Sequence, residues 1–204
     1  MDYRLYAITD CTMDRETLLT SVEQAVSGGV TMLQYRPKLK DIPEMVEEAN
    51  ALQEILIPKN IPLIINDYAD VAKVVNADGV HLGQDDMKPT SVRDYLGAGF
   101  VIGLSVGTDD EMQRLDVGVV DYMGTGAVYG TNTKSDAGDA IGIDGFKNIR
   151  NQVLIPTVAI GGITYENAGA LIDAGADGIA VISSLFRTDD IKQSAMDFKA
   201  LWTR

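Results

Sequence analysis

Short runs of apolar residues recur along the whole chain, and each is followed by polar residues and then by a segment with apolar positions at helical spacing. This alternation is typical of strands and helices that follow one another in a parallel α/β fold. The apolar runs occupy residues 5–9, 31–35, 62–65, 79–82, 101–104, 122–128, 157–160 and 178–182. Eight strands in 204 residues leave about 25 residues per unit, which suits a compact barrel. We therefore predict a single α/β domain over residues 1–204, a closed (β/α)8 TIM barrel with parallel strands; an open doubly wound sheet is the alternative.

The segments between the apolar runs predict helices and one long loop. Helices are expected over residues 17–26, 91–96 and 166–174, and the first two start near a Thr or Ser cap. Small residues and Gly precede three of the strands, at residues 27–30, 76–80 and 174–179, and this internal echo favours equivalent units. Residues 130–145 are rich in Gly, Asp, Thr and Asn, and such a long turn-rich stretch predicts an active-site loop.

Composition narrows the class of protein. With 17 Lys and Arg against 30 Asp and Glu, the formal net charge is −13, which argues against binding to nucleic-acid backbones. The hydrophobic fraction of 46% is that of an ordinary globular domain. A single cysteine, Cys11, excludes an internal disulfide and a structural zinc site. No basic start leads into an apolar segment and no stretch is long enough to span a bilayer, so we expect a cytoplasmic enzyme.

Polar residues stand at the carboxyl ends of the predicted strands, where a parallel barrel carries its reactive groups. Asn66 and Asp67 end the third strand, and the fourth strand leads to Asp86. Oxygen ligands from neighbouring strand ends suit Mg²⁺, which takes one or two carboxylates and completes its shell with water and phosphate oxygens. Taken singly, Asp67 could cap the following helix, as Asp10 is expected to do after the first strand, and Asp86 could be a turn residue. The two carboxylates together favour a metal site.

Three cations are expected at the same rim. Arg36 and Lys38 alternate along the end of the second strand, so both side chains leave the segment on one side, and Lys134 lies on the long loop. A solvated basic edge would explain each of them alone. In a protein of charge −13, however, three cations beside a predicted Mg²⁺ site form a clamp for pyrophosphate.

The ends of the last two strands predict a second anion site. Gly161 and Gly162 follow the seventh strand, and Ser183 and Ser184 follow the eighth. A tight turn and a helix N-cap are the alternatives, but barrels of this type often bind a phosphate here through backbone amides. His81, the single histidine, lies within the fourth strand and is expected to be a structural hydrogen-bonding residue rather than a general base.

Ordered segments along nearly the whole chain resemble the thiamine phosphate synthase family. The matching segments are residues 5–10 (LYAITD), 28–38 (GGVTMLQYRPK), 62–67 (PLIIND), 77–87 (ADGVHLGQDDM), 131–134 (TNTK) and 159–163 (AIGGI). The sequence Gly-Val-His-Leu-Gly-Gln with its following acidic pair is the most specific of them. The Gly-Gly pair is shared with other phosphate-binding barrels.

The resemblance implies a Mg²⁺-dependent transferase that couples hydroxymethylpyrimidine pyrophosphate with thiazole phosphate and releases pyrophosphate and thiamine phosphate. It implies a pyrimidine carbocation that the thiazole nitrogen captures. The implied pyrimidine pyrophosphate ligands are Gln34, Arg36, Lys38, Asn66, Ser105 and Lys134, with Asp67 and Asp86 on Mg²⁺; the thiazole phosphate is placed near Thr131, Thr133, Gly162, Ile182 and Ser183. Arg36, Lys38, Ser105 and Lys134 are the implied catalytic residues. The partners are then small molecules, with no nucleic acid and no membrane, and a homo-oligomer is left open.

Two residues depart from the family pattern. Pro37 stands where an acidic residue is common, and Gly130 stands where a proline is common. We expect Gly130 to loosen the loop that carries Lys134, and Pro37 to fix φ between two cations.

Two other functions stay open. A thiazole tautomerase-like relative uses a histidine shortly after the fifth strand, where this chain has Ser-Val-Gly-Thr at residues 105–108. A non-enzymatic phosphate-binding barrel would need the anion sites but no Mg²⁺ carboxylates. Turnover that depends on Mg²⁺ separates the synthase from such a sensor.

Overall fold

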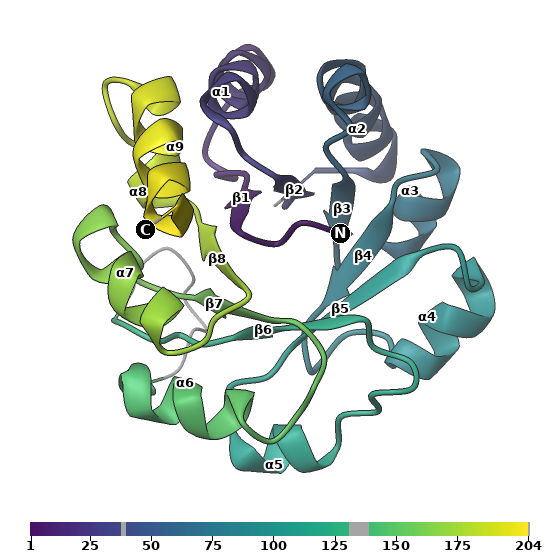
Figure 1. Cartoon of the computed structure of the whole chain (residues 1–204). Helices are drawn as coiled ribbons and strands as arrows, with labels where there is room; N and C mark the ends of the chain where they lie inside the picture. Colours follow the sequence, from purple (N-terminus) through teal and green to yellow (C-terminus); the bar gives the residue numbers. More distant parts are fainter. Residues whose placement is uncertain (38–39, 131–138, 204) are drawn as a thin grey trace.

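The computed structural model is a closed barrel of eight parallel strands, and it describes residues 1–37, 40–130 and 139–203. Each strand pairs with the next along the chain, and β8 returns to pair with β1, so the ring has no edge (Figure 1). The strands are β1 (Leu5–Ile8), β2 (Met32–Tyr35), β3 (Leu63–Asn66), β4 (Gly79–Leu82), β5 (Val101–Ser105), β6 (Tyr122–Thr125), β7 (Thr157–Ile160) and β8 (Gly178–Val181). The barrel prediction is therefore confirmed, and the open doubly wound sheet is wrong.

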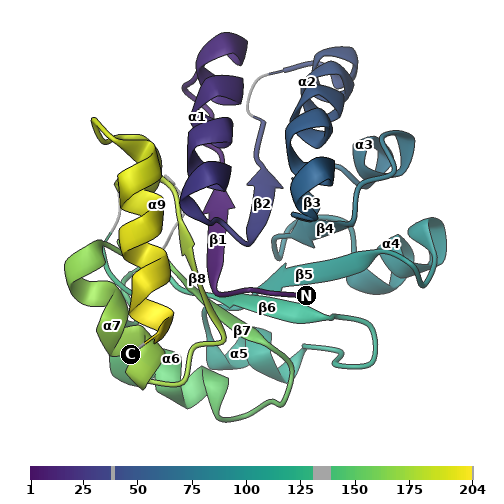
Figure 2. The same cartoon turned by 45° about the horizontal axis from the view of Figure 1, so that its top comes forward.

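Helices surround the strands and complete the βα units. They are α1 (Arg15–Gly28), α2 (Ile42–Leu56), α3 (Ala69–Val74), α4 (Pro89–Leu96), α5 (Asp109–Gln113), α6 (Gly142–Arg150), α7 (Tyr165–Asp173), α8 (Ser183–Phe186) and α9 (Ile191–Ala200), with 3-10 turns at Ile57–Lys59 and Leu201–Thr203. Figure 2 shows α1 standing between α2 and α9 on the outside of β1 and β2. Among the helices described, none is both long and apolar enough to cross a membrane.

Three local predictions need correction. Strand β6 ends at Thr125 and not at residue 128, because Ala127 and Val128 are buried in a loop. Helix α1 is capped by Asp14, whose carboxylate accepts from the Thr17 backbone N–H at 2.8 Å, and not by a Thr or Ser. Helix α4 begins with Pro89, and its N-cap residue is Lys88, which makes no side-chain cap hydrogen bond, so the expected Thr or Ser cap is wrong.

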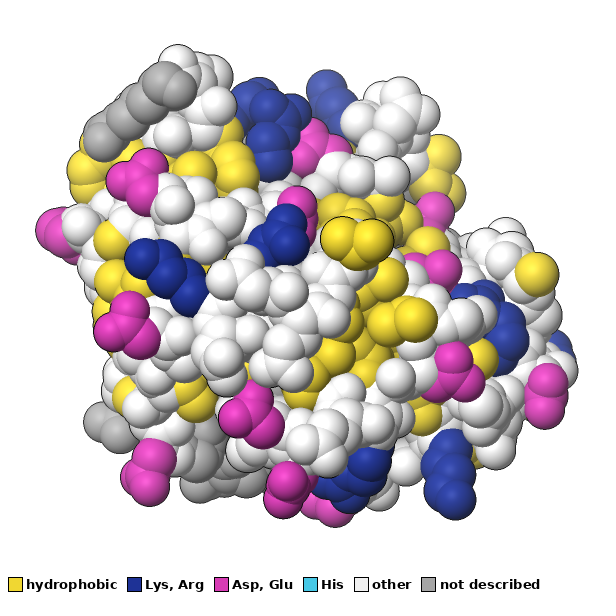
Figure 3. Space-filling view, turned by 60° about the horizontal axis from the view of Figure 1, so that its bottom comes forward, with side chains coloured by type: hydrophobic (Ala, Val, Ile, Leu, Met, Phe, Trp, Pro, Cys, Tyr) yellow, Lys and Arg dark blue, Asp and Glu magenta, His cyan; other side chains and the backbone are white. Residues whose placement is uncertain are grey.

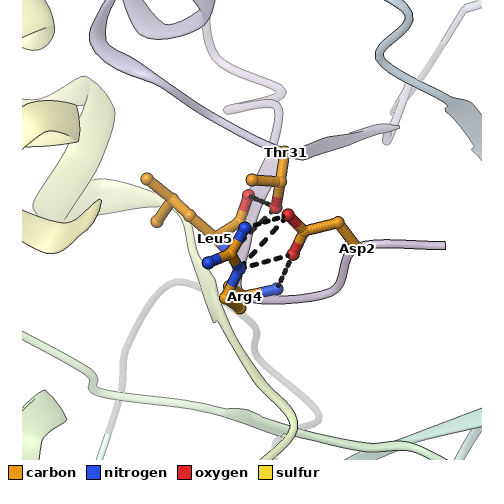
Figure 4. Close-up of polar contacts among 4 residues, drawn as sticks. All are labelled: Asp2, Arg4, Leu5 and Thr31. Atoms are coloured by element: carbon orange, nitrogen blue, oxygen red, sulfur yellow. Dashed lines mark hydrogen bonds and ion pairs between the residues drawn. The ribbon is translucent and has the colours of Figure 1, made fainter. Parts of the chain in front are cut away.

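The residues immediately before β2, β4, β6 and β8 share a hydrogen-bonding role. Asp78, Asp121 and Asp177 stand immediately before β4, β6 and β8, and each carboxylate accepts from a backbone N–H at the start of the preceding strand. The distances are 2.8 Å to Leu63 N, 2.7 Å to Ile102 N and 2.9 Å to Thr157 N. Thr31 does the same with its hydroxyl for Leu5 N at 3.0 Å, next to an ion pair between Arg4 and Asp2 (Figure 4). A repeated acceptor thus satisfies the amino ends of β1, β3, β5 and β7.

The side chains divide between two cores because successive residues of a strand face opposite sides of the sheet. Most apolar side chains pack outward against the helices. A smaller cluster fills the barrel interior: Tyr6, Ile8, Met32, Ile64, Tyr122, Val158 and Ala180. Tyr3 closes the amino end of the barrel, with its ring centroid 5.1 Å from that of Tyr122. The interior is therefore filled at the amino end, and space remains at the carboxyl end.

Candidate active site

A cavity of about 1540 Å³ opens at the carboxyl ends of the strands. Every strand contributes to it, and the contributing residues include Ile8, Gln34, Asn66, His81, Ser105, Gly124, Ile160 and Val181. This is the end at which barrels of this fold carry their active sites. The predicted convergence of the strand ends on one rim is confirmed.

Most of the predicted site residues line this cavity. They are Gln34, Arg36, Asn66, Asp67, Asp86, Ser105, Gly162, Ile182 and Ser183. Four others, Lys38, Thr131, Thr133 and Lys134, lie outside the described residues. Of the predicted loop 130–145, residues 142–145 are the first turn of α6, so the loop ends earlier than expected.

The end of β2 holds Gln34 and Arg36 in fixed positions. The Arg36 side chain is largely buried, and its backbone N–H donates to Thr9 Oγ1 at 2.9 Å. Thr9 N–H in turn donates to the Gln34 carbonyl at 2.9 Å, which extends the pairing of β1 and β2 beyond the strands. A buried guanidinium without a bound anion costs free energy, so this arrangement suits a ligand of negative charge.

A chain of hydrogen bonds crosses the floor of the cavity. Gln34 Nε2 donates to Tyr6 Oη at 2.8 Å, and Tyr6 Oη lies 2.8 Å from Tyr122 Oη. His81 Nδ1 lies 2.9 Å from Tyr122 Oη, and His81 Nε2 lies 3.0 Å from Ser105 Oγ. Burial raises the pKa of both tyrosines well above the usual value, so both stay neutral at physiological pH.

This chain connects two predicted ligands, Gln34 and Ser105, through residues that sequence reasoning did not assign to the site. Both ring nitrogens of His81 have partners, as expected for a structural residue. The sequence could have indicated Tyr6 and Tyr122. Both are tyrosines at inward positions of predicted strands, and a buried hydroxyl group requires a hydrogen-bond partner.

The two predicted metal ligands occupy neighbouring strand ends. Asp67 follows β3 with φ +65°, and its N–H donates to the His81 carbonyl at 2.8 Å, which holds the turn against β4. The N-cap residue of α3 is Tyr68, so Asp67 is not its N-cap residue. Asp86 Oδ2 accepts from Gly83 N–H at 2.6 Å and closes a turn. Asp86 is thus a turn residue that also lines the cavity.

The side chains around these two carboxylates determine whether Mg²⁺ could be held there. In the described part of the chain, no three His, Cys, Asp or Glu side chains gather to hold a metal by themselves. Asp67 and Asp86 nevertheless share the cavity with Asn66 and Gln84, so the available donors are oxygen-rich. Mg²⁺ is usually held by one or two carboxylates plus water and substrate phosphates, and this donor set fits that pattern.

Glycines form the turn after β7. Gly161 and Gly162 have φ of +98° and +63°, a backbone region that residues with a Cβ rarely adopt. A Cβ on Gly162 would lie 2.6 Å from the Gly130 carbonyl oxygen and 2.8 Å from Tyr129 Cβ. The turn therefore brings the backbone after β7 against the start of the long loop, and glycine is required there. Gly161 and Gly162 therefore do form a tight turn, and such a turn is compatible with an anion site.

The segment after β8 carries Ile182 and Ser183 into the cavity. Ile182 is the N-cap residue of α8 and makes no side-chain cap, so the interpretation of Ser183 and Ser184 as N-caps is wrong. The predicted cap at Asp10 is also wrong, because Asp14 caps α1. Asp10 instead accepts from Arg187 Nε at 2.6 Å, and Arg187 lines the cavity beside Ser183. Sequence reasoning missed Arg187 because it follows β8 by six residues.

The fold and this cavity define the class of protein. It is a (β/α)8 barrel with a polar site, which contains carboxylates, at the carboxyl ends of its strands. The family model for thiamine monophosphate synthase matches residues 5–185. The thiamine-phosphate synthase of Azorhizobium caulinodans is 48% identical over 201 residues, which cover 98% of this chain and 95% of the relative. That of Xanthobacter autotrophicus is 46% identical over 98% of this chain and 95% of the relative.

A solved structure agrees with these sequence comparisons. Thiamine phosphate pyrophosphorylase from Pyrococcus furiosus superposes with a TM-score of 0.88 at 33% identity, and the alignment covers 98% of this chain and 95% of that one. The chain belongs to the thiamine monophosphate synthase family, and it is an enzyme of the transferase class.

Proposed function

We propose that this protein is a thiamine-phosphate synthase that joins hydroxymethylpyrimidine pyrophosphate to thiazole phosphate and releases pyrophosphate. The observation that carries the proposal is the convergence of Arg36, Asp67 and Asp86 on one cavity, in a chain 48% identical to a thiamine-phosphate synthase over 98% of its length. Both substrates carry phosphate groups, and the cavity offers separate groups for two anions at β2–β4 and at β7–β8.

The pyrimidine pyrophosphate belongs at the ends of β2 to β5. Arg36 binds the pyrophosphate, and Gln34, Asn66 and Ser105 bind the substrate as polar neighbours along the same rim. Gln34 is oriented by Tyr6, and Ser105 is within hydrogen-bonding distance of His81. Lys38 and Lys134 are proposed to add positive charge to the same anion.

Asp67 and Asp86 would hold Mg²⁺ at the ends of β3 and β4. When bound, Mg²⁺ supplies positive charge that neutralises the pyrophosphate and makes it a better leaving group. Arg36 stands two strands away from Asp86 around the same rim, so it can reach the anion from the other side. The remaining chemistry rests on the residues of the chain itself.

The reaction follows from charge placement and orientation. The bond between the pyrimidine methylene carbon and the pyrophosphate oxygen breaks, and its electron pair leaves with the oxygen. Arg36, Lys38 and Lys134 stabilise the negative charge that develops there. The thiazole nitrogen then donates its lone pair to the methylene carbon and forms the new C–N bond. No protein nucleophile is needed, because orientation of the two substrates supplies much of the rate.

The thiazole phosphate belongs at the ends of β7 and β8. Gly162, Ile182 and Ser183 line this side of the cavity, and the glycine conformation lets the backbone approach a ligand closely. Thr131 and Thr133 are proposed to complete this site. The phosphate then anchors the ring so that its nitrogen faces the pyrimidine.

The first test measures product. The purified protein is incubated with both substrates, with Mg²⁺ or with EDTA, and thiamine phosphate is detected by chromatography. We expect product only with Mg²⁺, and we expect Asp67→Asn and Asp86→Asn each to lower kcat/KM by about 100-fold or more, since a charge-stabilising group is lost. Asp94→Asn, an exposed carboxylate on α4, is the matched control and should leave the rate unchanged. Full turnover in EDTA, or in both Asp variants, would contradict the metal assignment.

The tautomerase alternative is disfavoured by the segment after β5. Thr108 Oγ1 accepts from Glu111 N–H at 3.2 Å, and Glu111 Oε2 accepts from Gly107 N–H at 2.7 Å. These groups cap α5, and no histidine stands among residues 105–108 to move a proton. The expected cytoplasmic location and any homo-oligomeric state remain predictions.

A further inference from the structure

An ion pair at the rim of the cavity has no role in the function proposed so far. Arg187 Nε donates to Asp10 Oδ2 at 2.6 Å, and the Asp10 side chain is only 3% exposed while that of Arg187 is 56% exposed. Asp10 also accepts from Thr12 N–H at 3.1 Å and from Thr12 Oγ1 at 2.9 Å. A buried, fully used carboxylate thus holds an arginine whose outer part stays accessible.

The charges of this pair are secure at physiological pH. Burial by itself raises the pKa of Asp10, but the hydrogen bonds from Arg187 and Thr12 outweigh it and bring the pKa below its usual value. The same hydrogen bond raises the pKa of Arg187. Asp10 is therefore a permanent anchor, and the guanidinium is a permanent cation.

Barrel closure places the guanidinium beside the proposed thiazole phosphate site. Asp10 follows β1 and Arg187 follows β8, and these strands are neighbours only because the ring closes. The Arg187 N–H donates to the Ser183 carbonyl at 2.9 Å, which ties the arginine to the segment that carries Ser183. Among the lysines and arginines that the structure describes, Arg36 and Arg187 line the cavity.

These two arginines stand at different points of the rim, with the end of β1 between them. Arg36 follows β2, next to the carboxylates after β3 and β4, whereas Arg187 follows β8 and contacts Asp10 after β1. Because Nε makes the hydrogen bond to Asp10, the two terminal nitrogens are not used in that bond. Two parallel N–H donors in this geometry match two oxygens of a phosphate.

We propose that Arg187 binds the phosphate of the thiazole substrate, and that Asp10 is the positioning residue that holds its guanidinium at the rim. The inference rests on the proposed function, and it adds a charged partner to the site lined by Gly162, Ile182 and Ser183. It also explains how a protein of charge −13 holds a second anion without a second metal. A purely structural role, in which the pair only fastens β1 to β8, is the competing explanation.

The experiment compares two acceptors, thiazole phosphate and the corresponding thiazole alcohol, in steady-state kinetics with Mg²⁺. For Arg187→Gln we expect KM for thiazole phosphate to rise about 10- to 100-fold, the loss typical of one charge-assisted contact. KM for the pyrimidine pyrophosphate and kcat/KM for the thiazole alcohol should change less than about 3-fold, because neither depends on this phosphate. For Arg187→Lys, which keeps the charge without the paired donors, KM for thiazole phosphate should lie between the values of wild type and Arg187→Gln.

Arg15→Gln is the matched control, because Arg15 is also half-exposed and ion-paired, to Glu47 at 3.3 Å, but does not line the cavity. It should leave all constants unchanged. A structural role would instead lower the thermal midpoint of Arg187→Gln and change the constants for both acceptors alike, and that result would overturn the inference. Unchanged KM for thiazole phosphate in a folded Arg187→Gln protein would also overturn it, while leaving the proposed function intact.

Failure of the proposed function has a different signature. The wild-type protein would then form no thiamine phosphate at all, whatever the residue at position 187. Calorimetric titration of wild type and Arg187→Lys with thiazole phosphate still measures the contact in that case. Weaker binding by the lysine variant supports the role of Arg187, and equal binding contradicts it.

Discussion

At the scale of single residues, the barrel interior combines apolar packing with a few polar groups that must satisfy one another. Tyr6, Tyr122 and His81 are each at most 8% exposed, so none can rely on solvent for a hydrogen bond. Hydrogen bonds in such surroundings contribute modestly when made and cost more when one partner is missing. The side chains of Gln34 and Ser105 are therefore held in place by Tyr6 and His81 in the barrel interior.

Tyr122→Phe tests this arrangement. The change removes the hydroxyl that lies 2.8 Å from Tyr6 Oη and 2.9 Å from His81 Nδ1, and it keeps the ring. Because two buried groups lose a partner, we expect the free energy of unfolding in urea to fall by about 1–3 kcal/mol. Tyr165→Phe, at an exposed position, should change it by less than about 0.5 kcal/mol. Equal stability of wild type and Tyr122→Phe would show that water replaces the hydroxyl.

At the scale of elements, the turn between β7 and α7 decides the shape of the proposed thiazole phosphate site. Its positive φ angles and the close approach of Tyr129 and Gly130 leave no room for a side chain at Gly162. The segment leading into the long loop and the turn after β7 therefore form one packed unit. A substitution that moves one of these two segments must therefore also move the other.

Gly162→Val should affect the two substrates unequally. The valine Cβ would contact the Tyr129 and Gly130 backbone, so the turn must shift and the β7–β8 side of the cavity must change shape. We expect KM for thiazole phosphate to rise more than about 10-fold, well beyond any rise for the pyrimidine pyrophosphate. Gly169→Val is the matched control, since a Cβ at that α7 position meets nothing within 4 Å. Equal rises for both substrates would mean that the two anion sites are assigned wrongly.

At the scale of the whole molecule, a strongly acidic chain keeps its positive charge local. Figure 3 shows one face on which Lys and Arg side chains are scattered among Asp and Glu, with apolar side chains gathered between them. Inside the cavity, by contrast, Arg36 after β2 and Arg187 after β8 both line the space for a ligand. Under the proposed function, we therefore expect individual cations, and not a basic surface, to bind the small phosphorylated substrates.

Buried tyrosines make the stability of the whole barrel sensitive to alkaline pH. Burial raises the pKa of Tyr3 to about 12, and it raises the pKa values of Tyr6, Tyr35 and Tyr122 further. Above pH 10 the unfolded chain loses protons that the folded chain retains, so the free energy of unfolding must fall as pH rises from there, and below pH 10 these groups contribute no change.

Urea titrations between pH 8 and about 11.5, followed by circular dichroism and by tyrosinate absorbance, measure this dependence. We expect the absorbance of the buried tyrosines to appear together with loss of helical signal. Complete tyrosine ionisation near pH 10 in a protein that stays folded would show that the hydroxyls of the barrel interior reach solvent.

The sequence by itself determined the barrel and the location of its site. Eight apolar runs at regular spacing fix the strand number, and the polar residues that close them, such as Asn66, Asp67 and Ser105, fix the rim. These features are local, because a strand and its last residue are read from a few consecutive positions. The sequence predicted helix caps and strand ends less accurately. Asp14, and not a Thr or Ser, caps α1, and the apolar residues 127–128 lie in a buried loop and not in β6.

Only the tertiary structure decided which side chains meet across the barrel. Tyr6 and Tyr122 are 116 residues apart, and Asp10 and Arg187 are 177 residues apart. The first pair meets because both side chains point inward from strands on different sides of the ring, and the second because β8 closes onto β1. No local pattern encodes such contacts, since ring closure and the register of all eight strands set them together.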